Sequence, residues 1–202
     1  MKQQPDPVPS RKEILITGFG GQGIVLAGLI VGRAASLWDR RESTLTQSYG
    51  PEARGGACSA QVIISDRVIH YPYVRRPDIL VCMSQGGYDK YSPLMHEDSV
   101  LLFDSDLVQV EPKRAAGSFA VPATRMAEEL GRKMMANIVM LGFFTAVTRT
   151  LSVDAARNAV ARSVPEGTEK MNLQAFNKGH DYGEAILKGW RKKADGQKGA
   201  KA

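Results

Sequence analysis

Hydrophobic residues fall into short apolar runs that alternate with helical patterns. Ile14–Thr17 is an apolar run that ends in glycines, which predicts a buried strand. The segment from Gln22 to about Trp38 is apolar around most of its circumference. We therefore expect a helix that a sheet covers on one side and another helix, or another subunit, covers on the other.

The same two kinds of pattern continue along the chain. Strands are predicted at 43–49, 58–65, 79–83 and 100–103, and helices at 87–91, 127–145, 153–163 and 168–188. Gly131 is a possible break in the second of these helices. Asp66-Arg67 predicts a tight turn that would pair 58–65 with 68–71 as a hairpin. The alternation predicts an α/β class, with a Rossmann-like, mostly parallel open sheet, a hairpin insertion, helices on both faces and a helical C-terminal part.

The composition is that of an ordinary globular protein, with 43% hydrophobic and 24% charged residues among 202. We expect a single α/β domain over residues 13–188, with a disordered, proline-rich lead at 1–12 and a flexible basic tail at 189–202. Residues 1–10 lack the apolar region of a secretory signal, and the sequence has no apolar run of about 18 residues. We therefore expect a cytoplasmic protein without a membrane span.

The net charge of +6 is concentrated near the termini. Residues 188–202 carry six Lys or Arg and one Asp, whereas the body of the chain is neutral. A domain that binds nucleic acid would show a basic patch within its fold, so we expect no nucleic-acid partner.

The cysteines and histidines predict no metal centre in this chain. Cys58 and Cys82 each lie in an apolar run, which predicts buried free thiols in a reducing compartment. Two cysteines are too few for an iron–sulfur cluster, which takes about four. His70, His96 and His180 lie far apart in the sequence.

A glycine turn, Gly18-Phe19-Gly20-Gly21-Gln22-Gly23, joins the first predicted strand to the first predicted helix. A GxGxxG pattern in this context lets a phosphate approach the backbone, where the first N–H groups of the helix point at the anion. This predicts contact with a phosphate or a nucleotide. The alternative is a tightly packed strand–helix turn that holds no ligand.

An ordinary NAD site is disfavoured by its missing ribose ligand. Such a site needs an acidic residue about 20 positions after the glycines, at the end of the second strand. Glu42 has that spacing, but it would begin the second strand rather than end it. Asp104 and Asp106 follow a later strand, where we expect turn or helix-cap roles.

A second glycine-rich segment, residues 47–56, holds an aromatic residue, an acid and a base close together. Its candidate site residues are Tyr49, Gly50, Glu52, Arg54, Gly55 and Gly56. Arg54 suits a bidentate contact with phosphate or carboxylate, with Glu52 orienting it. In an open α/β sheet, loops beyond the strand ends form the ligand crevice. The alternative is an internal Glu–Arg pair that stiffens the loop.

The two glycine-rich motifs together resemble the gamma subunit of 2-oxoacid:ferredoxin (acceptor) oxidoreductases. The resemblance covers roughly residues 12–187. Later stretches also fit it, namely Ser65-Asp66, Tyr71-Pro72, Pro77-Asp78, Ala136-Asn137 and Leu141-Gly142. Ser48–Gly56 looks most like the 2-oxoglutarate type, while branched-chain and aryl 2-oxoacids stay open.

The resemblance implies an assembly that decarboxylates a 2-oxoacid oxidatively with coenzyme A, giving acyl-CoA, CO2 and a reduced acceptor. Thiamine diphosphate, Mg and iron–sulfur clusters would lie in partner subunits, and this chain alone would hold no cofactor and no catalytic residue. The expected partners are a thiamine diphosphate-binding chain, a 2-oxoacid-binding chain, a ferredoxin-like chain and coenzyme A as co-substrate.

The resemblance also implies roles for particular residues. The amides of Gly20, Gly21, Gln22 and Gly23 would face the coenzyme A phosphates or a subunit interface. Tyr49, Glu52 and Arg54 would shape a loop that faces the thiamine diphosphate site. Asn137 lies among apolar neighbours and needs a hydrogen-bond partner, for which we expect backbone.

Two rival functions stay open at this point. One is a self-sufficient NAD(P)- or flavin-dependent oxidoreductase, which requires Glu42 to end a strand. The other is a non-catalytic regulatory module that binds a nucleotide and uses its basic tail to hold an acidic partner.

Overall fold

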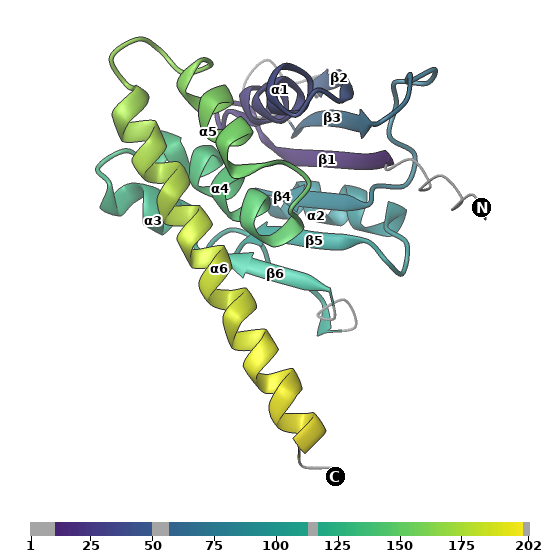
Figure 1. Ribbon diagram of the computed structural model, residues 1–202, viewed down its shortest axis with the longest axis vertical. Helices are drawn as coiled ribbons and strands as arrows, with labels where there is room; N and C mark the ends of the chain where they lie inside the picture. The colour runs from purple at the N-terminus through teal and green to yellow at the C-terminus, as the bar shows by residue number, and fades with distance from the viewer. Residues whose placement is uncertain (1–10, 50–56, 113–116, 200–202) are drawn as a thin grey trace, which may run out of the picture.

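The computed structural model describes residues 11–49, 57–112 and 117–199. Within these ranges six strands form one sheet in the order β2-β3-β1-β4-β5-β6 (Figure 1). The strands are β1 (Arg11–Phe19), β2 (Glu42–Tyr49), β3 (Ala57–Ser65), β4 (Ile79–Cys82), β5 (Val100–Asp104) and β6 (Ser118–Val121). β1, β4, β5 and β6 run parallel, while β3 is antiparallel to both β1 and β2.

Helices cover both faces of this sheet, as the sequence predicts. They are α1 (Ile24–Arg33), α2 (Gln85–Tyr91), α3 (Ala123–Glu129), α4 (Ala136–Thr148), α5 (Val153–Ala161) and α6 (Glu169–Gly199). α1 and α4 lie on one face with α5 and α6 packed against them, and α2 lies on the other (Figure 1). The prediction that α1 is covered on two sides is confirmed, because α5 and α4 lie over it within this chain.

Alternate residues of the strands supply two separate apolar cores. Ile14 and Ile16 of β1 belong to the larger core, which α1 and α4 complete. Leu15, between them, belongs to the smaller core beneath α2. All three are at most 2% exposed. Period-two alternation thus explains how one strand is buried on both faces.

The hairpin predicted between 58–65 and 68–71 is wrong. β3 instead pairs with β2, and residues 66–78 form no strand. Pro72 and Pro77 lack the N–H groups that a strand needs. The Val74 N–H donates to a side chain, Gln61 Oε1, at 2.9 Å. The insertion is therefore the β2–β3 pair.

The C-terminal half differs from the prediction in two further respects. The short strand β6 lies where no strand is predicted, and it extends the parallel sheet beyond β5. α6 runs to Gly199 rather than ending at 188, since Lys and Arg favour helices. Trp190 stacks on Phe119 of β6 with ring centroids 5.0 Å apart. The break at Gly131 is confirmed, because it separates α3 from α4.

Candidate functional site

The glycine turn lies at the carboxyl end of β1, where the order of the strands reverses. From β1 the chain crosses by α1 to β2 on one side, and it later returns to β4 on the other side of β1. In open α/β sheets this reversal leaves a crevice at the carboxyl ends of the strands, where ligands bind. The fold thus places the turn where a ligand site is expected.

The Gln22 side chain spans this reversal point. Its Oε1 accepts a hydrogen bond from the Phe19 N–H at 2.6 Å, and its Nε2 donates to the Met83 carbonyl at 2.8 Å. One carboxamide therefore joins the ends of β1 and β4. Gly18 leaves the room for it, because a Cβ there would lie 2.4 Å from Gln22 Oε1.

Gly23 and Asn137 fix the start of α1 against α4. Gly23 has a φ of 71°, which L-residues with a side chain seldom adopt. Asn137, only 3% exposed, donates from Nδ2 to the Gly23 carbonyl at 3.1 Å. A Cβ on Gly23 would lie 2.3 Å from that nitrogen. The prediction that Asn137 binds backbone is confirmed.

Two hollows lie on either side of the exposed Met134 side chain, between the glycine turn and the segment before α4. One hollow, of about 250 Å³, is mostly apolar and also carries Gly21, Gly23, Arg132, Asn137 and Asn172. The other, of about 310 Å³, carries Gly21, Gln22, Thr124 and Lys133. The glycine turn therefore forms one wall of both hollows.

The electrostatic character of this crevice favours an anion. α1 has neither a side-chain N-cap nor an acidic residue in its first turn, so its first N–H groups are uncompensated. Arg132 and Lys133 add two cationic side chains. Lys133 Nζ lies 3.2 Å from Glu128 Oε1, and both of these side chains are more than half exposed. Such exposed pairs are weak, so an anionic ligand can compete for the lysine.

The predicted site residues divide into two groups. Gly21, Gln22 and Gly23 line the hollows, and Gly20 is exposed beside them. Tyr49 ends β2, with its backbone opposite Cys58. Gly50, Glu52, Arg54, Gly55 and Gly56 lie outside the described residues, so their predicted roles stay predictions.

The three acidic residues considered as nucleotide ligands have other positions or roles in the structure. Glu42 begins β2, which removes the ribose ligand that a self-sufficient NAD enzyme requires. Buried Asp104 accepts hydrogen bonds from the Thr124 N–H at 2.9 Å and from the Thr124 hydroxyl at 2.6 Å, at the start of α3. Asp106 pairs with Arg125 at 2.6 Å. The predicted turn and cap roles of the two aspartates are confirmed.

Sequence reasoning missed Arg132, Lys133 and Met134 as parts of the crevice. They lie more than a hundred residues after the glycine turn, and only the break between α3 and α4 brings them to it. The available signal was a basic pair directly after Gly131. A predicted helix break followed by two basic residues indicates an exposed, positively charged turn.

Both cysteines are buried free thiols, as predicted. Burial raises the pKa of Cys58, and it raises the pKa of Cys82 far more, with the nearby charge of Asp89 adding to the effect. Across residues 11–49, 57–112 and 117–199, no group of three His, Cys, Asp or Glu side chains is arranged to hold a metal. None of the helices in these ranges is both long and apolar enough to cross a bilayer.

A mostly parallel α/β sheet with a glycine turn and an anion-favouring crevice at its reversal point is typical of Rossmann-like domains. The chain belongs to the pyruvate ferredoxin/flavodoxin oxidoreductase family, whose model matches residues 13–182. It is 50% identical to the KorC subunit of 2-oxoglutarate synthase from Methanocaldococcus jannaschii, over 89% of this chain and 97% of that one. It is 34% identical to a ketoisovalerate oxidoreductase subunit, VorA, from Methanothermobacter marburgensis, over 92% of this chain and 40% of that one.

Solved structures agree with this assignment. The gamma subunit of keto/oxoacid ferredoxin oxidoreductase from Geobacter sulfurreducens superposes with a TM-score of 0.76 at 38% identity, over 87% of this chain and 98% of that one. A 2-oxoglutarate:ferredoxin oxidoreductase from Magnetococcus marinus, with 2-oxoglutarate, coenzyme A and succinyl-CoA bound, gives 0.75 at 22% identity, over 87% of this chain and 31% of that one. The second likeness shows the fold alone. The resemblance to a gamma subunit is confirmed, and the chain is an oxidoreductase subunit rather than a regulatory module.

Proposed function

We propose that the chain is the gamma-type subunit of a cytoplasmic 2-oxoglutarate:ferredoxin oxidoreductase, which converts 2-oxoglutarate and coenzyme A into succinyl-CoA, CO2 and reduced ferredoxin. The order of the identities supports this substrate. Three subunits of 2-oxoglutarate synthases are 47–50% identical to the chain, whereas a pyruvate synthase subunit, PorC, is 33% identical. A branched-chain 2-oxoacid is the alternative substrate, since the chain is also 34% identical to VorA.

The cofactors belong to partner subunits in this proposal. This chain has two cysteines, too few to ligate an iron–sulfur cluster. We assign thiamine diphosphate, magnesium and the clusters to a thiamine diphosphate-binding chain, a 2-oxoacid-binding chain and a ferredoxin-like chain. This subunit then contributes binding and positioning, and the reacting groups come from its partners.

Coenzyme A occupies the crevice at the glycine turn in this proposal, and the pairing of that turn with Arg132 and Lys133 carries it. The Gln22 N–H donates to the Phe19 carbonyl at 3.1 Å within the turn. The amides of Gly21, Gly23 and the first residues of α1 are then the donors for phosphate. The two cationic side chains supply the charge that a phosphate requires.

The apolar hollow beside the turn suits the uncharged pantetheine arm. Asn137 and Asn172 line it and are 3% and 8% exposed. Each directs its amide nitrogen to protein oxygens, at the Gly23 carbonyl and at Thr168. Their Oδ1 atoms accept no hydrogen bond from the described residues. Two acceptor oxygens that line a mostly apolar hollow fit the two amide N–H groups of pantetheine.

Steady-state kinetics of the assembled complex under anaerobic conditions test this proposal. Lys133→Ala and Arg132→Ala should each raise the KM for coenzyme A about tenfold and leave kcat within about twofold, because a charge that binds the remote phosphates acts on binding alone. Lys90→Ala, an exposed lysine on α2, is the matched control. Unchanged KM values in both variants would contradict the site.

The same assay tests the substrate and the glycine-rich loop. Turnover that is fastest with a branched-chain 2-oxoacid would overturn the choice of 2-oxoglutarate and leave the coenzyme A site standing. Tyr49, Glu52 and Arg54 remain proposed contacts near the thiamine diphosphate site. Unchanged KM and turnover in Arg54→Ala would remove Arg54 from it.

A further inference from the structure

The loop 66–78, which links β3 to β4, lies at the opposite end of the sheet from the glycine turn. Asp78 immediately precedes β4, and its Oδ2 accepts a hydrogen bond from the Glu13 N–H near the start of β1 at 2.7 Å. From Glu13 to Phe19, β1 extends about 20 Å at the usual strand rise. A molecule bound at this loop therefore leaves the crevice at the glycine turn accessible.

The loop has no regular secondary structure, but side chains of the sheet hold its backbone in place. The Arg75 N–H donates to Glu13 Oε2 at 3.0 Å, and the Val74 N–H donates to Gln61 Oε1 at 2.9 Å. The Val74 side chain is 9% exposed and belongs to the core beneath α2. The loop is thus preorganised, which lowers the entropic cost of binding a partner.

Its outward surface has the composition of a protein interface. Tyr71 and Tyr73 are 44% and 52% exposed and meet edge to face, with ring centroids 5.6 Å apart. The Arg75 guanidinium lies 4.6 Å from the centroid of the Tyr71 ring. Tyr and Arg are among the residues that most often carry the binding energy of an interface. Neither tyrosine belongs to either apolar core.

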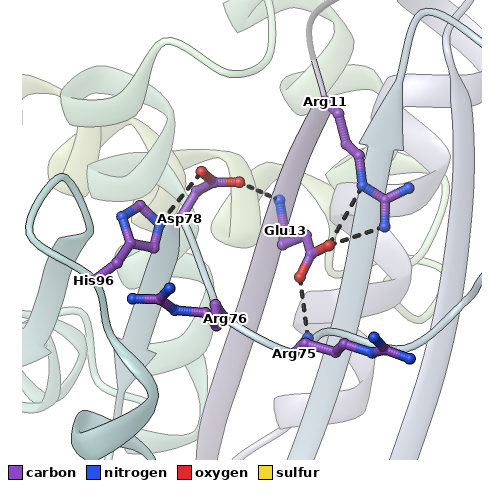
Figure 2. A pocket seen from close by; sticks show the side chains of 6 residues that line it. All are labelled: Arg11, Glu13, Arg75, Arg76, Asp78 and His96. Carbon is purple, nitrogen blue, oxygen red and sulfur yellow. Dashed lines mark hydrogen bonds and ion pairs between the residues drawn. The ribbon is translucent and has the colours of Figure 1, made fainter.

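A hollow of about 510 Å³ adjoins this surface, because Arg75 takes part in both. It is lined by Arg11, Glu13, Arg75, Arg76, Asp78 and His96 (Figure 2). Both carboxylates already have partners within the chain. Glu13 Oε1 pairs with Arg11 at 2.9 Å, and Asp78 Oδ1 lies 3.6 Å from His96 Nε2.

Arg76 is the cation that remains. Its side chain extends toward His96 and away from Glu13 (Figure 2). No described residue forms a hydrogen bond or an ion pair with it. A guanidinium is well suited to a bidentate carboxylate contact. A small free anion can contact the arginine alone, whereas a protein surface can place one carboxylate on Arg76 and apolar atoms on the tyrosines at the same time.

We propose that Tyr71, Tyr73, Arg75 and Arg76 form a docking surface for a second subunit of the oxidoreductase, one that presents Asp or Glu side chains. The proposal rests on the proposed function only in requiring a multisubunit complex. The docking surface lies at the end of the sheet opposite the proposed coenzyme A site.

Charge reversal in the co-expressed complex tests this surface. Arg76→Glu should weaken the association of this chain with its cognate subunits about tenfold or more, measured by analytical ultracentrifugation, and Tyr73→Ala should weaken it by a similar factor. Arg162→Glu, the same change at an exposed position after α5, is the matched control. Neither Arg76→Glu nor Tyr73→Ala should lower the thermal midpoint of the isolated chain by more than the control does.

A photo-crosslinking amino acid at position 73 identifies the occupant. We expect a crosslink to an acid-rich peptide of another subunit. A crosslink to a second copy of this chain, or phosphate binding to the isolated chain that Arg76→Glu abolishes, would overturn the assignment. The assignment would also be overturned if Arg76→Glu and Tyr73→Ala both associate as strongly as the Arg162→Glu control. Because association is measured without turnover, a complex that assembles but does not use 2-oxoglutarate contradicts the proposed function alone.

Discussion

The two ends of β1 and β4 are stabilised by different means. At the carboxyl end, the side-chain amides of Asn137 and Gln22 bind backbone atoms. Each fits because a neighbouring glycine, Gly23 or Gly18, has no side chain. At the amino end, Glu13 and Asp78 bind backbone N–H groups and pair with Arg11 and His96, and these side chains are 18–39% exposed. The first end depends on close packing and the second on partly solvated charge.

This difference separates folding from binding. Buried hydrogen bonds are costly to break, because the remaining partner stays desolvated. Solvated ion pairs contribute about 0–1 kcal/mol. Substitutions at the glycine turn should therefore act first on stability, whereas substitutions at the amino end should act on association with little effect on folding.

The largest expected effect comes from Gly23→Ala. The methyl group would lie 2.3 Å from Asn137 Nδ2, and the residue would keep a left-handed φ. A left-handed backbone costs about 1–2 kcal/mol and a broken buried hydrogen bond about 1–3, so we expect a loss of about 3 kcal/mol in the free energy of unfolding. Urea denaturation of the isolated chain measures it.

Gly21→Ala is the matched control for Gly23→Ala. Gly21 has a φ of 94°, but no atom lies within 4 Å of a Cβ placed there. Its cost should be confined to the backbone term of about 1–2 kcal/mol. Equal losses in the two variants would show that the contact with Asn137 contributes nothing.

A smaller loss is expected for Gln22→Ala. The change removes an exposed hydrogen bond from the Phe19 N–H and a partly buried one to the Met83 carbonyl, which together should cost about 1–2 kcal/mol. Gln85→Ala removes a comparable bridge, between Asp89 and the backbone of Gln109, in exposed surroundings. Denaturation midpoints that fall equally would show that the bridge between β1 and β4 has no special weight.

The sequence was most informative where local pattern and local chemistry coincide. The glycine turn, its flanking strand and helix, and the need of Asn137 for a backbone partner all followed from short stretches of chain. The pairing of β3 was missed because 68–71 has strand-like residues, whereas hydrogen bonds from the loop backbone to Gln61 and Glu13 hold the loop instead. Such distant side-chain contacts leave no signal in local periodicity.

The candidate site was only half predictable for the same reason. The Gln22 backbone was expected to face a ligand, but its amide closes the turn and its side chain spans two strands. The break at Gly131 brings Arg132 and Lys133 to the crevice. Periodicity indicated the break but not which part of the molecule the following residues would face. Residue types on one segment can be read locally, but which distant segment faces them depends on packing.

A third effect concerns Cys82 in β4, the strand that joins the two ends. Burial raises its pKa above the ordinary value of 9.0, so the native state keeps this proton after the unfolded chain has lost it. Stability is complete below about pH 9 and falls as pH rises beyond it, by at most about 1.4 kcal/mol per pH unit for one thiol. Urea denaturation between pH 8 and about pH 10.5 should show this slope. Cys82→Ala should reduce it, and an identical slope in the variant would contradict the burial of the thiol.

The smallest effect is expected at the amino end. Glu13→Ala removes the pair with Arg11 and the acceptor of the Arg75 N–H, both in partly exposed surroundings, so we expect a loss below about 1 kcal/mol. Glu13→Gln keeps an acceptor oxygen without the charge, and it should recover most of that loss if the hydrogen bond to the loop is the larger contribution. The KM for coenzyme A should stay the same in both variants, since the glycine turn lies at the other end of β1. A loss as large as that of Gly23→Ala would show that the amino end also depends on buried contacts, and the separation of folding from association along this strand would then fail.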